Sequence, residues 1–93
     1  MVKSLVSDET SVSIQVIPNP ARDEAVLLHE LPENTRAELV FMDAVGRPVQ
    51  KIIVQGGVER TTFSVSSLAN GYYRFMLIDE KGVIGQGQLT IMR

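Results

Sequence analysis

The stretch IQVIPNPARDEAVL, residues 14–27, decides how this chain folds. Apolar and polar residues alternate on either side of its two prolines, as in β-strands with one buried face. A proline fixes its own φ near about −65° and has no N–H to donate to a ladder, so Pro18 and Pro20 rule out one continuous central strand. Each also keeps the residue before it, Ile17 or Asn19, out of the helical region. We therefore expect one strand to end here and the chain to turn or cross over and pair elsewhere.

The period of two continues along the rest of the chain, and helical spacing over three turns occurs nowhere. Segment 48–55, PVQKIIVQ, is rich in β-branched residues but mixed in phase, which predicts a bulge or burial on both faces. The alternation predicts inward-facing side chains at Val12, Ile14 and Val16; Val26 and Leu28; Ala37, Leu39 and Phe41; Thr61, Phe63 and Val65; Tyr73, Phe75 and Leu77; and Leu89 and Ile91.

Turn signals separate these runs at intervals of about 8 to 12 residues, as in a sandwich or barrel. They are PNP at 18–20, LPEN at 31–34, DAVG at 43–46, QGG at 55–57, ANG at 69–71 and DEKG at 79–82. Six turns imply seven strands, and no connection is long enough for a parallel crossover. We therefore predict an all-β, seven-stranded antiparallel sandwich resembling the immunoglobulin-like domains, with a small barrel as the alternative.

Length and composition place the chain among small folded domains. Its 93 residues are 44% hydrophobic and 22% charged, which suits one thin core, and we expect residues 1–11 to be a linker or an added start and residues 12–93 to be the domain. The net charge is −2 with scattered basic residues, so we expect no nucleic-acid partner. No apolar run is long enough to span a bilayer or to form the core of a signal peptide.

The residues that could carry catalysis or a cofactor are few. The chain has no cysteine, which excludes disulfides, zinc–thiolate sites and thiol nucleophiles. His29 is the only histidine, and no nucleophile elbow accompanies it. Adjacent acids such as Asp23 and Glu24 point to opposite faces of a strand, or into solvent in a turn. We predict that the domain is not an enzyme and that it has no catalytic residue, metal site or cofactor.

Four landmarks occur in a fixed order: PNPARDEAVL at 18–27, ELVFMDAVGRPV at 38–49, SLANGYY at 67–73, and a last strand that ends in GQLTIMR. Together they resemble the C-terminal sorting domain of proteins exported by the type IX (Por) secretion system of the Bacteroidetes, over about residues 12–93. The family pattern falls on Pro18, Asn19 and Pro20, on Asp43, Gly46 and Val49, and on Leu68, Gly71 and Tyr73. This chain departs from it where the family commonly has lysine near the start of the last strand, because Gln86 and Gln88 stand there.

The resemblance implies a non-catalytic signal that directs an attached upstream cargo through the translocon. The implied partners are the translocon, its shuttle proteins and a sortase-like cysteine protease that usually cuts the domain off. The implied location is the periplasm in transit, then the outer membrane, the cell surface or the medium. Two alternatives remain: a retained domain of a secretion-machinery component, and a free-standing secreted immunoglobulin-like binding or adhesion module.

The motif residues also have a structural interpretation. Asp43 accepts a backbone hydrogen bond within the DAVG turn and Gly46 supplies the positive φ that closes it, which we favour over a calcium site. Leu68 is expected to close the end of the core and Asn70-Gly71 to make the turn. The Tyr73 ring is expected to point inward, with its hydroxyl bonded to a backbone group as in a tyrosine corner.

Two sets of residues are candidates for contact with a partner. The last strand, roughly Val83 to Met92, is uncharged, and its glycines would let another backbone approach an exposed sheet edge. The candidates for recognition by the translocon are Gly85, Gly87, Leu89, Ile91 and Arg93. Tyr72 and Arg74 share the opposite face from Tyr73 and could form a surface patch, although a solvated sheet face is the simpler interpretation.

Overall fold

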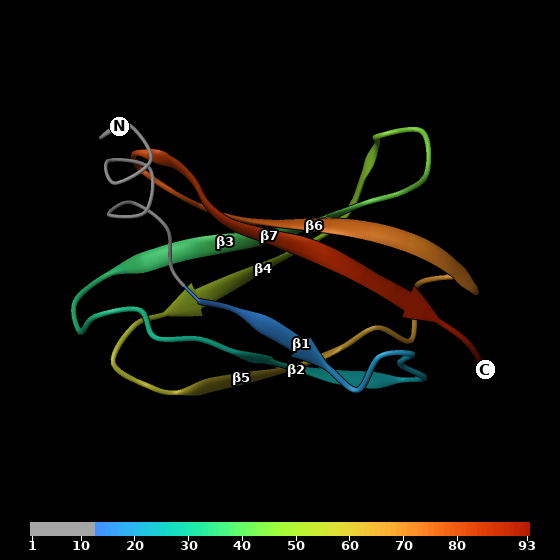
Figure 1. The fold of residues 1–93 in the computed structure, drawn as a ribbon, viewed down its shortest axis with the longest axis horizontal. Helices are drawn as coiled ribbons and strands as arrows, with labels where there is room; N and C mark the ends of the chain where they lie inside the picture. Colours follow the sequence, from blue (N-terminus) through green and yellow to red (C-terminus); the bar gives the residue numbers. More distant parts are fainter. Residues whose placement is uncertain (1–12) are drawn as a thin grey trace, which may run out of the picture.

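The computed structural model describes residues 13–93, so the predicted linker and Val12 lie outside the described residues. Seven strands follow one another along the chain (Figure 1). They are β1 (Gln15–Ile17), β2 (Glu24–Leu28), β3 (Arg36–Met42), β4 (Pro48–Gln55), β5 (Arg60–Ser64), β6 (Gly71–Asp79) and β7 (Gly82–Ile91). The predicted number of strands is confirmed.

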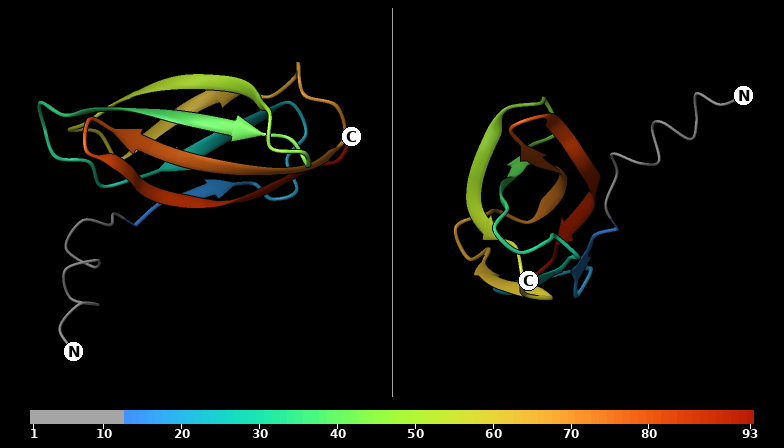
Figure 2. Two further views of the ribbon diagram at one scale, coloured as in Figure 1. Left: turned by 90° about the horizontal axis from the view of Figure 1, so that it is seen from above. Right: turned by 90° about the vertical axis from the view of Figure 1, so that its left-hand side faces the viewer.

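The strands form two sheets, ordered β1-β2-β5 and β4-β3-β6-β7, in which every neighbouring pair is antiparallel. Figure 2 shows the two layers and, along the long axis, the ring of strands that surrounds the core. The order is that of an immunoglobulin-like sandwich in which β4 joins the sheet of β3, β6 and β7. The described residues contain no helix that could span a membrane.

The core lies between the two sheets and is built around Phe41. Its ring centroid is 5.6 Å from that of Phe63 on the opposite sheet and 5.6 Å from that of Phe75 on the neighbouring strand. Tilted aromatic pairs at this separation are favourable beyond their buried area. Leu39 of β3 and Leu77 of β6 are also fully buried. The phase predicted for β3 and β6 is therefore confirmed.

The phase predicted for β2 is wrong. Ala25 and Leu27 are buried, whereas Val26 and Leu28 are half-buried. The antiparallel register places Leu27 opposite Val16, so the inward-facing side chains of β2 follow those of β1. The intervening prolines break the alternation, so the phase of β1 could not be carried across them. Thr61, also predicted to face the core, is half-buried.

The chain around the two prolines crosses between the sheets and returns. Ala21 forms an isolated parallel bridge with Ile91 of the opposite sheet, and the chain then comes back as β2 to pair with β1. The predicted crossing is thus present, but the chain returns and β2 pairs with β1 on one side and with β5 on the other. The peptide bonds before Pro18 and Pro20 are both cis.

Strand β4 contains the bulge that its mixed phase predicted. Phe41 lies opposite Gln50 and Met42 opposite Pro48, so Val49 is the extra residue. Burial on both faces is not found, because Val54 is fully buried while Ile53 is 40% exposed. The sequence of β4 is mixed in phase because some of its apolar side chains, such as that of Ile53, lie on the outer face of the sheet.

The turn before β6 lies earlier than predicted. Its hydrogen bond joins Leu68 N to Val65 O, at 3.0 Å, whereas Gly71 already belongs to β6 and lies opposite Ile91. Leu68 is buried at the end of the core, as expected. Asn70-Gly71 therefore follows the turn and leads into the strand.

Gly85 and Gly87 make room for side chains of this domain, a packing role that the sequence did not indicate. A Cβ on Gly87 would lie 2.6 Å from Cζ of Phe75, and a Cβ on Gly85 would lie 2.9 Å from Cδ1 of Ile14. No ordinary contact of a Cβ atom is this close. Both glycines therefore serve internal packing.

We predict that Gly87→Ala lowers the free energy of unfolding by about 1–2 kcal/mol, because overpacking against Phe75 outweighs the smaller entropic gain of replacing glycine. Urea denaturation monitored by circular dichroism measures this change. The adjacent exposed substitution Gln86→Ala is the control and should change stability by less than about 0.5 kcal/mol. Equal stability of the two variants would contradict the packing role.

Candidate recognition surface

Residues 18–21, here called the edge clamp, close the outer edge of β7 over its last residues. Asn19 Oδ1 accepts a hydrogen bond from Thr90 N at 3.0 Å, and Asn19 Nδ2 donates to Gln88 O at 3.2 Å. Ala21 N donates to Thr90 O at 2.8 Å, and Met92 N donates to Ala21 O at 2.9 Å. The clamp therefore acts as a short extra strand beside β7, which reduces the hazard of an unpaired edge.

The outer edge of the rest of β7 is unpaired within the described chain. Between residues 82 and 87 the strand pairs only with β6, which lies on its inner side. Gln86 is in phase with Gln88 and Thr90, so its backbone groups point to the outer edge. Within the described chain this is the part of β7 that another strand could pair with.

The opposite side of the sandwich is closed by the side chain of Gln50 on β4. Its Nε2 donates to Ser64 O of β5 at 2.7 Å, and its Oε1 accepts from Ser67 Oγ at 3.3 Å. The amide thus joins the edge strands of the two sheets. Each open side of the sandwich is crossed by a side-chain amide, from Asn19 on one side and Gln50 on the other.

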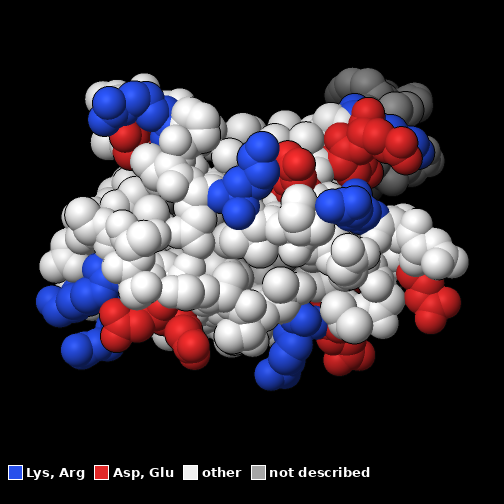
Figure 3. All heavy atoms as spheres, turned by 180° about the vertical axis from the view of Figure 1, so that it is seen from behind, with Lys and Arg blue, Asp and Glu red and all other residues white. Residues whose placement is uncertain are grey.

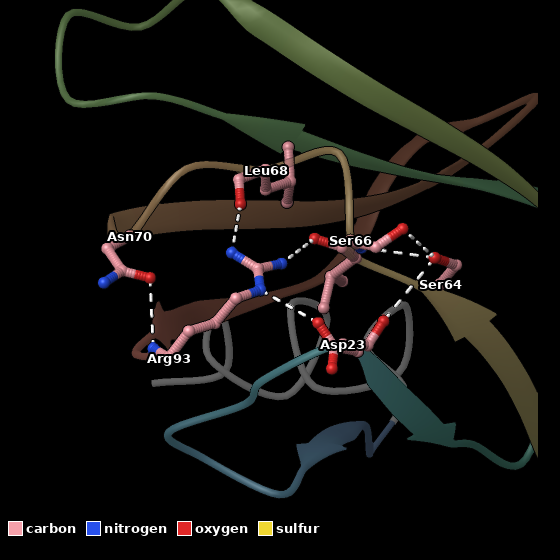
Figure 4. Close-up of polar contacts among 7 residues, drawn as sticks. Asp23, Ser64, Ser66, Leu68, Asn70 and Arg93 are labelled. Carbon is pink, nitrogen blue, oxygen red and sulfur yellow. Dashed lines mark hydrogen bonds and ion pairs between the residues drawn. The ribbon is translucent and has the colours of Figure 1, made fainter.

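Arg93 joins three segments at one end of the molecule (Figure 4). Its Nη1 donates to Leu68 O and its Nη2 to Val65 O, both at 2.7 Å, while its Nε lies 2.9 Å from Asp23 Oδ1. Its backbone N also donates to Asn70 Oδ1 at 3.1 Å. The guanidinium therefore satisfies two carbonyl groups of the turn before β6 and fixes that turn to the start of β2.

Asp43 closes the turn between β3 and β4 as predicted. Its Oδ1 accepts from Arg47 N at 2.9 Å and from Val45 N at 3.0 Å, and Gly46 has φ 88°. The Arg47 guanidinium also lies 3.1 Å from Oδ2. The backbone hydrogen bond from Arg47, followed by that from Val45 and the guanidinium charge, lowers the pKa of Asp43. The described residues hold no group of three or more acids or histidines that could bind a metal.

Tyr73 forms the predicted tyrosine corner. Its ring is buried, and its hydroxyl donates to Ala69 O at 2.6 Å. The other motif residues are also parts of turns and edges: Asn19 lies in the edge clamp and Val49 at the β4 bulge. Their structural interpretation is therefore well supported.

Tyr72 and Arg74 lie on the outer face of β6, as their alternation with Tyr73 predicted. Tyr72 is 55% exposed, and its hydroxyl donates to Gln88 Oε1 on β7. Arg74 is exposed and lies opposite both Met42 and Gln88 in the sheet. These side chains are available to a partner in the folded domain.

The residues proposed from the sequence for translocon recognition do not form one accessible set. Leu89 and Ile91 are buried in the core, so their side chains cannot be read by a partner while the domain is folded. Gly85 and Gly87 face Ile14 and Phe75. Arg93 is bonded to its own chain. Among the predicted contacts, Tyr72 and Arg74 remain exposed, together with the part of the β7 edge that the clamp does not cover.

His29 lies just beyond β2 and is a buried structural residue. It is 3% exposed, and its Nε2 lies 3.1 Å from Thr61 Oγ1, whereas Nδ1 is buried without a partner. Desolvation by burial lowers the pKa of the imidazole. No arrangement of a nucleophile, an acid and a base surrounds it within the described residues.

Two features of this surface were missed by sequence reasoning. The bonds of Asn19 to β7 and of Arg93 to Asp23 join residues about 70 positions apart. Neither the alternation nor the spacing of residues in the sequence identifies contacts between positions so far apart.

The structure thus defines a small all-β domain whose polar side chains close turns and edges and whose exposed surface suits contact with another protein. The model of the family described as "Secretion system C-terminal sorting domain" matches residues 15–90. The chain belongs to this family of non-catalytic signals of the type IX secretion system, which direct the secretion of cargo proteins across the outer membrane.

Similarity to other proteins is limited. No curated protein matches the chain. Among solved structures, an immunoglobulin-like protein from Pseudomonas aeruginosa is similar, with 11% sequence identity and a TM-score of 0.49. The match covers 88% of this chain and 90% of that one.

We predict that Asn19→Ala exposes the outer edge of β7. Loss of its two hydrogen bonds should lower the free energy of unfolding by about 1 kcal/mol. Amide hydrogen exchange measured by NMR should be at least about tenfold faster at Thr90, because a local opening no longer breaks the bond to Asn19. The Leu89 amide, which points toward β6, is the internal control. Unchanged exchange at Thr90 would show that the clamp does not depend on Asn19.

We predict that acidification destabilises the domain through His29. Because burial lowers its folded-state pKa, the neutral imidazole is favoured in the fold, so this contribution is fully present above about pH 6.5 and declines below it. Urea denaturation at about pH 7.5 and 5.5 should show a smaller pH effect for His29→Gln than for the unmodified chain. An identical pH dependence of the two proteins would contradict this assignment.

Proposed function

We propose that this domain is a folded signal that the type IX translocon reads at the outer edge of β7 and on the surface beside it. The observation that carries the proposal is the division of that edge: the clamp occupies the backbone of residues 88–92, whereas no strand formed by residues 13–93 pairs with residues 82–87 on that side. Such an edge can accept an extended segment of a partner by strand addition. Val83 and Gln86 are exposed there.

Membership of the family implies contact with the secretion machinery, and the particular partners are part of our proposal. We assign the translocon and its shuttle proteins to the readout, and a sortase-like cysteine protease to later removal of the domain. Residues 1–11 would then be the linker to the upstream cargo, and cleavage would occur in or before it. The cargo would pass through the periplasm and finish at the cell surface or in the medium.

A strand-blocking substitution tests the readout without removing core residues. In a reporter fused upstream of this domain, Gln86→Pro removes the outward N–H of the free edge, whereas Leu89 and Ile91 stay in the core. We expect export to fall by about tenfold, which corresponds to the loss of about one net backbone hydrogen bond with the partner. The amount of reporter in the medium and in the periplasm measures this effect in a host with the type IX system.

Gln86→Ala is the matched control and should be exported like the unmodified fusion, because it keeps the backbone N–H. Circular dichroism on both variants checks that the sandwich is intact. Equal export of the proline and alanine variants would reject strand addition at this edge. Mass spectrometry of the exported reporter locates the cut, and a reporter that retains the whole domain would reject cleavage.

A further inference from the structure

The outer face of the four-stranded sheet carries several apolar side chains among its polar ones. Its central rows combine Val40 and Met42 of β3 with Met76 of β6, and the registers place these side chains next to one another. Val49 and Ile53 of β4 are exposed at its margin. Several neighbouring apolar side chains on an outer face are a feature of protein contact sites.

The turn between β3 and β4 rises from this face and encloses a hollow of about 390 Å³. In Figure 1 the hairpin between β3 and β4 stands above the sandwich. The hollow has Met42 and Met76 on the strands, Arg74 beside them and Val45 in the turn. The bonds of Asp43 to Val45 and Arg47 hold the turn in place, so the hollow is preformed.

Arg74 gives this hollow a positive charge that no acidic side chain of residues 13–93 pairs with. The other charged side chains nearby are paired, Arg47 with Asp43 at 3.1 Å and Lys51 with Glu38 at 3.8 Å. Of the three ion pairs formed within residues 13–93, none includes Arg74. Figure 3 shows charges of both signs interspersed on the visible face. A lone guanidinium beside thioether side chains suits a partner group that is anionic next to an apolar one.

We propose that this hollow docks a segment of the export machinery that presents an aliphatic or aromatic side chain next to a carboxylate. The apolar side chain contacts Met42 and Met76, and the carboxylate binds the guanidinium of Arg74. The inference rests on the proposed function, because it supplies a second contact beside the free edge of β7. The two are linked across the sheet, where Met76 lies opposite Gln86 and Arg74 opposite Gln88.

A series of substitutions that change the charge at residue 74 tests the contact between the partner's carboxylate and Arg74, in the same reporter fusion. We expect Arg74→Glu to lower export by about fivefold, since attraction becomes repulsion, and Arg74→Lys to retain most of it. Arg74→Met keeps an apolar side chain without the charge, so its export should lie between those of the Glu and Lys variants. Arg60→Glu on the opposite sheet makes the same change in net charge at another exposed arginine and should leave export within about twofold.

A second pair of variants tests whether an apolar side chain of the partner enters the hollow. Val45 is 74% exposed in the turn, so Val45→Asp adds a carboxylate beside the hollow without touching the core. Val58→Asp makes the same substitution at a 51% exposed position outside the hollow. We expect only Val45→Asp to lower export.

The outcomes separate this inference from the proposed function. Export of Arg74→Glu at the unmodified level, or an equal loss with Arg60→Glu, overturns docking at the hollow. Full export of Arg74→Met overturns the acidic partner. If the unmodified fusion itself stays in the periplasm, the proposed function fails instead. Thermal unfolding of each variant confirms that the exposed substitutions leave the sandwich folded.

Discussion

The hydrogen bonds between the edge clamp and the last strand are the constraint on which the rest of this domain depends. A sandwich of two sheets has two open sides, and the side at β1 and β7 is closed by backbone and amide groups of residues 18–21. The prolines end β1, which frees Asn19 and Ala21 to reach the opposite sheet. The same closure leaves one half of the β7 edge occupied and the other half open, and so determines where a partner strand could add.

The other polar contacts extend this closure around the molecule. Gln50 joins the edge strands on the far side, Arg93 fixes the turn before β6 to the start of β2, and Tyr73 anchors its own corner. None of these contacts contributes much alone, because a typical hydrogen bond within a protein contributes about 1 kcal/mol. Together they define the edges of a domain whose core is packed between a three-stranded and a four-stranded sheet. Asn19 and Tyr73, two of the residues that carry the resemblance, are therefore among the residues that close this small sandwich.

The sequence allowed the fold class to be predicted because its longest strands alternate without interruption. Ala37, Leu39 and Phe41 are buried as predicted, and so are Tyr73, Phe75 and Leu77. The prediction failed in β2, where the register with β1 sets the phase. The packing role of Gly85 and Gly87 was also not visible in the sequence, because Ile14 and Phe75 come from other parts of the chain. The surface was harder to predict for the same reason: alternation showed that Tyr72 and Arg74 face outward, but the hollow beside Arg74 depends on a turn that rises from another strand.

The position of the clamp also determines how this domain would respond to mechanical load. A cargo attached upstream would pull on the chain at the start of β1, which pairs with β2 through only three residue pairs. Force that peels β1 away would act next on Asn19 and Ala21, and through their hydrogen bonds on the last residues of β7, before it reached β3 and β6 at the centre of the four-stranded sheet. Tension from a cargo would therefore uncover the backbone of residues 88–92 while the core around Phe41 was still intact.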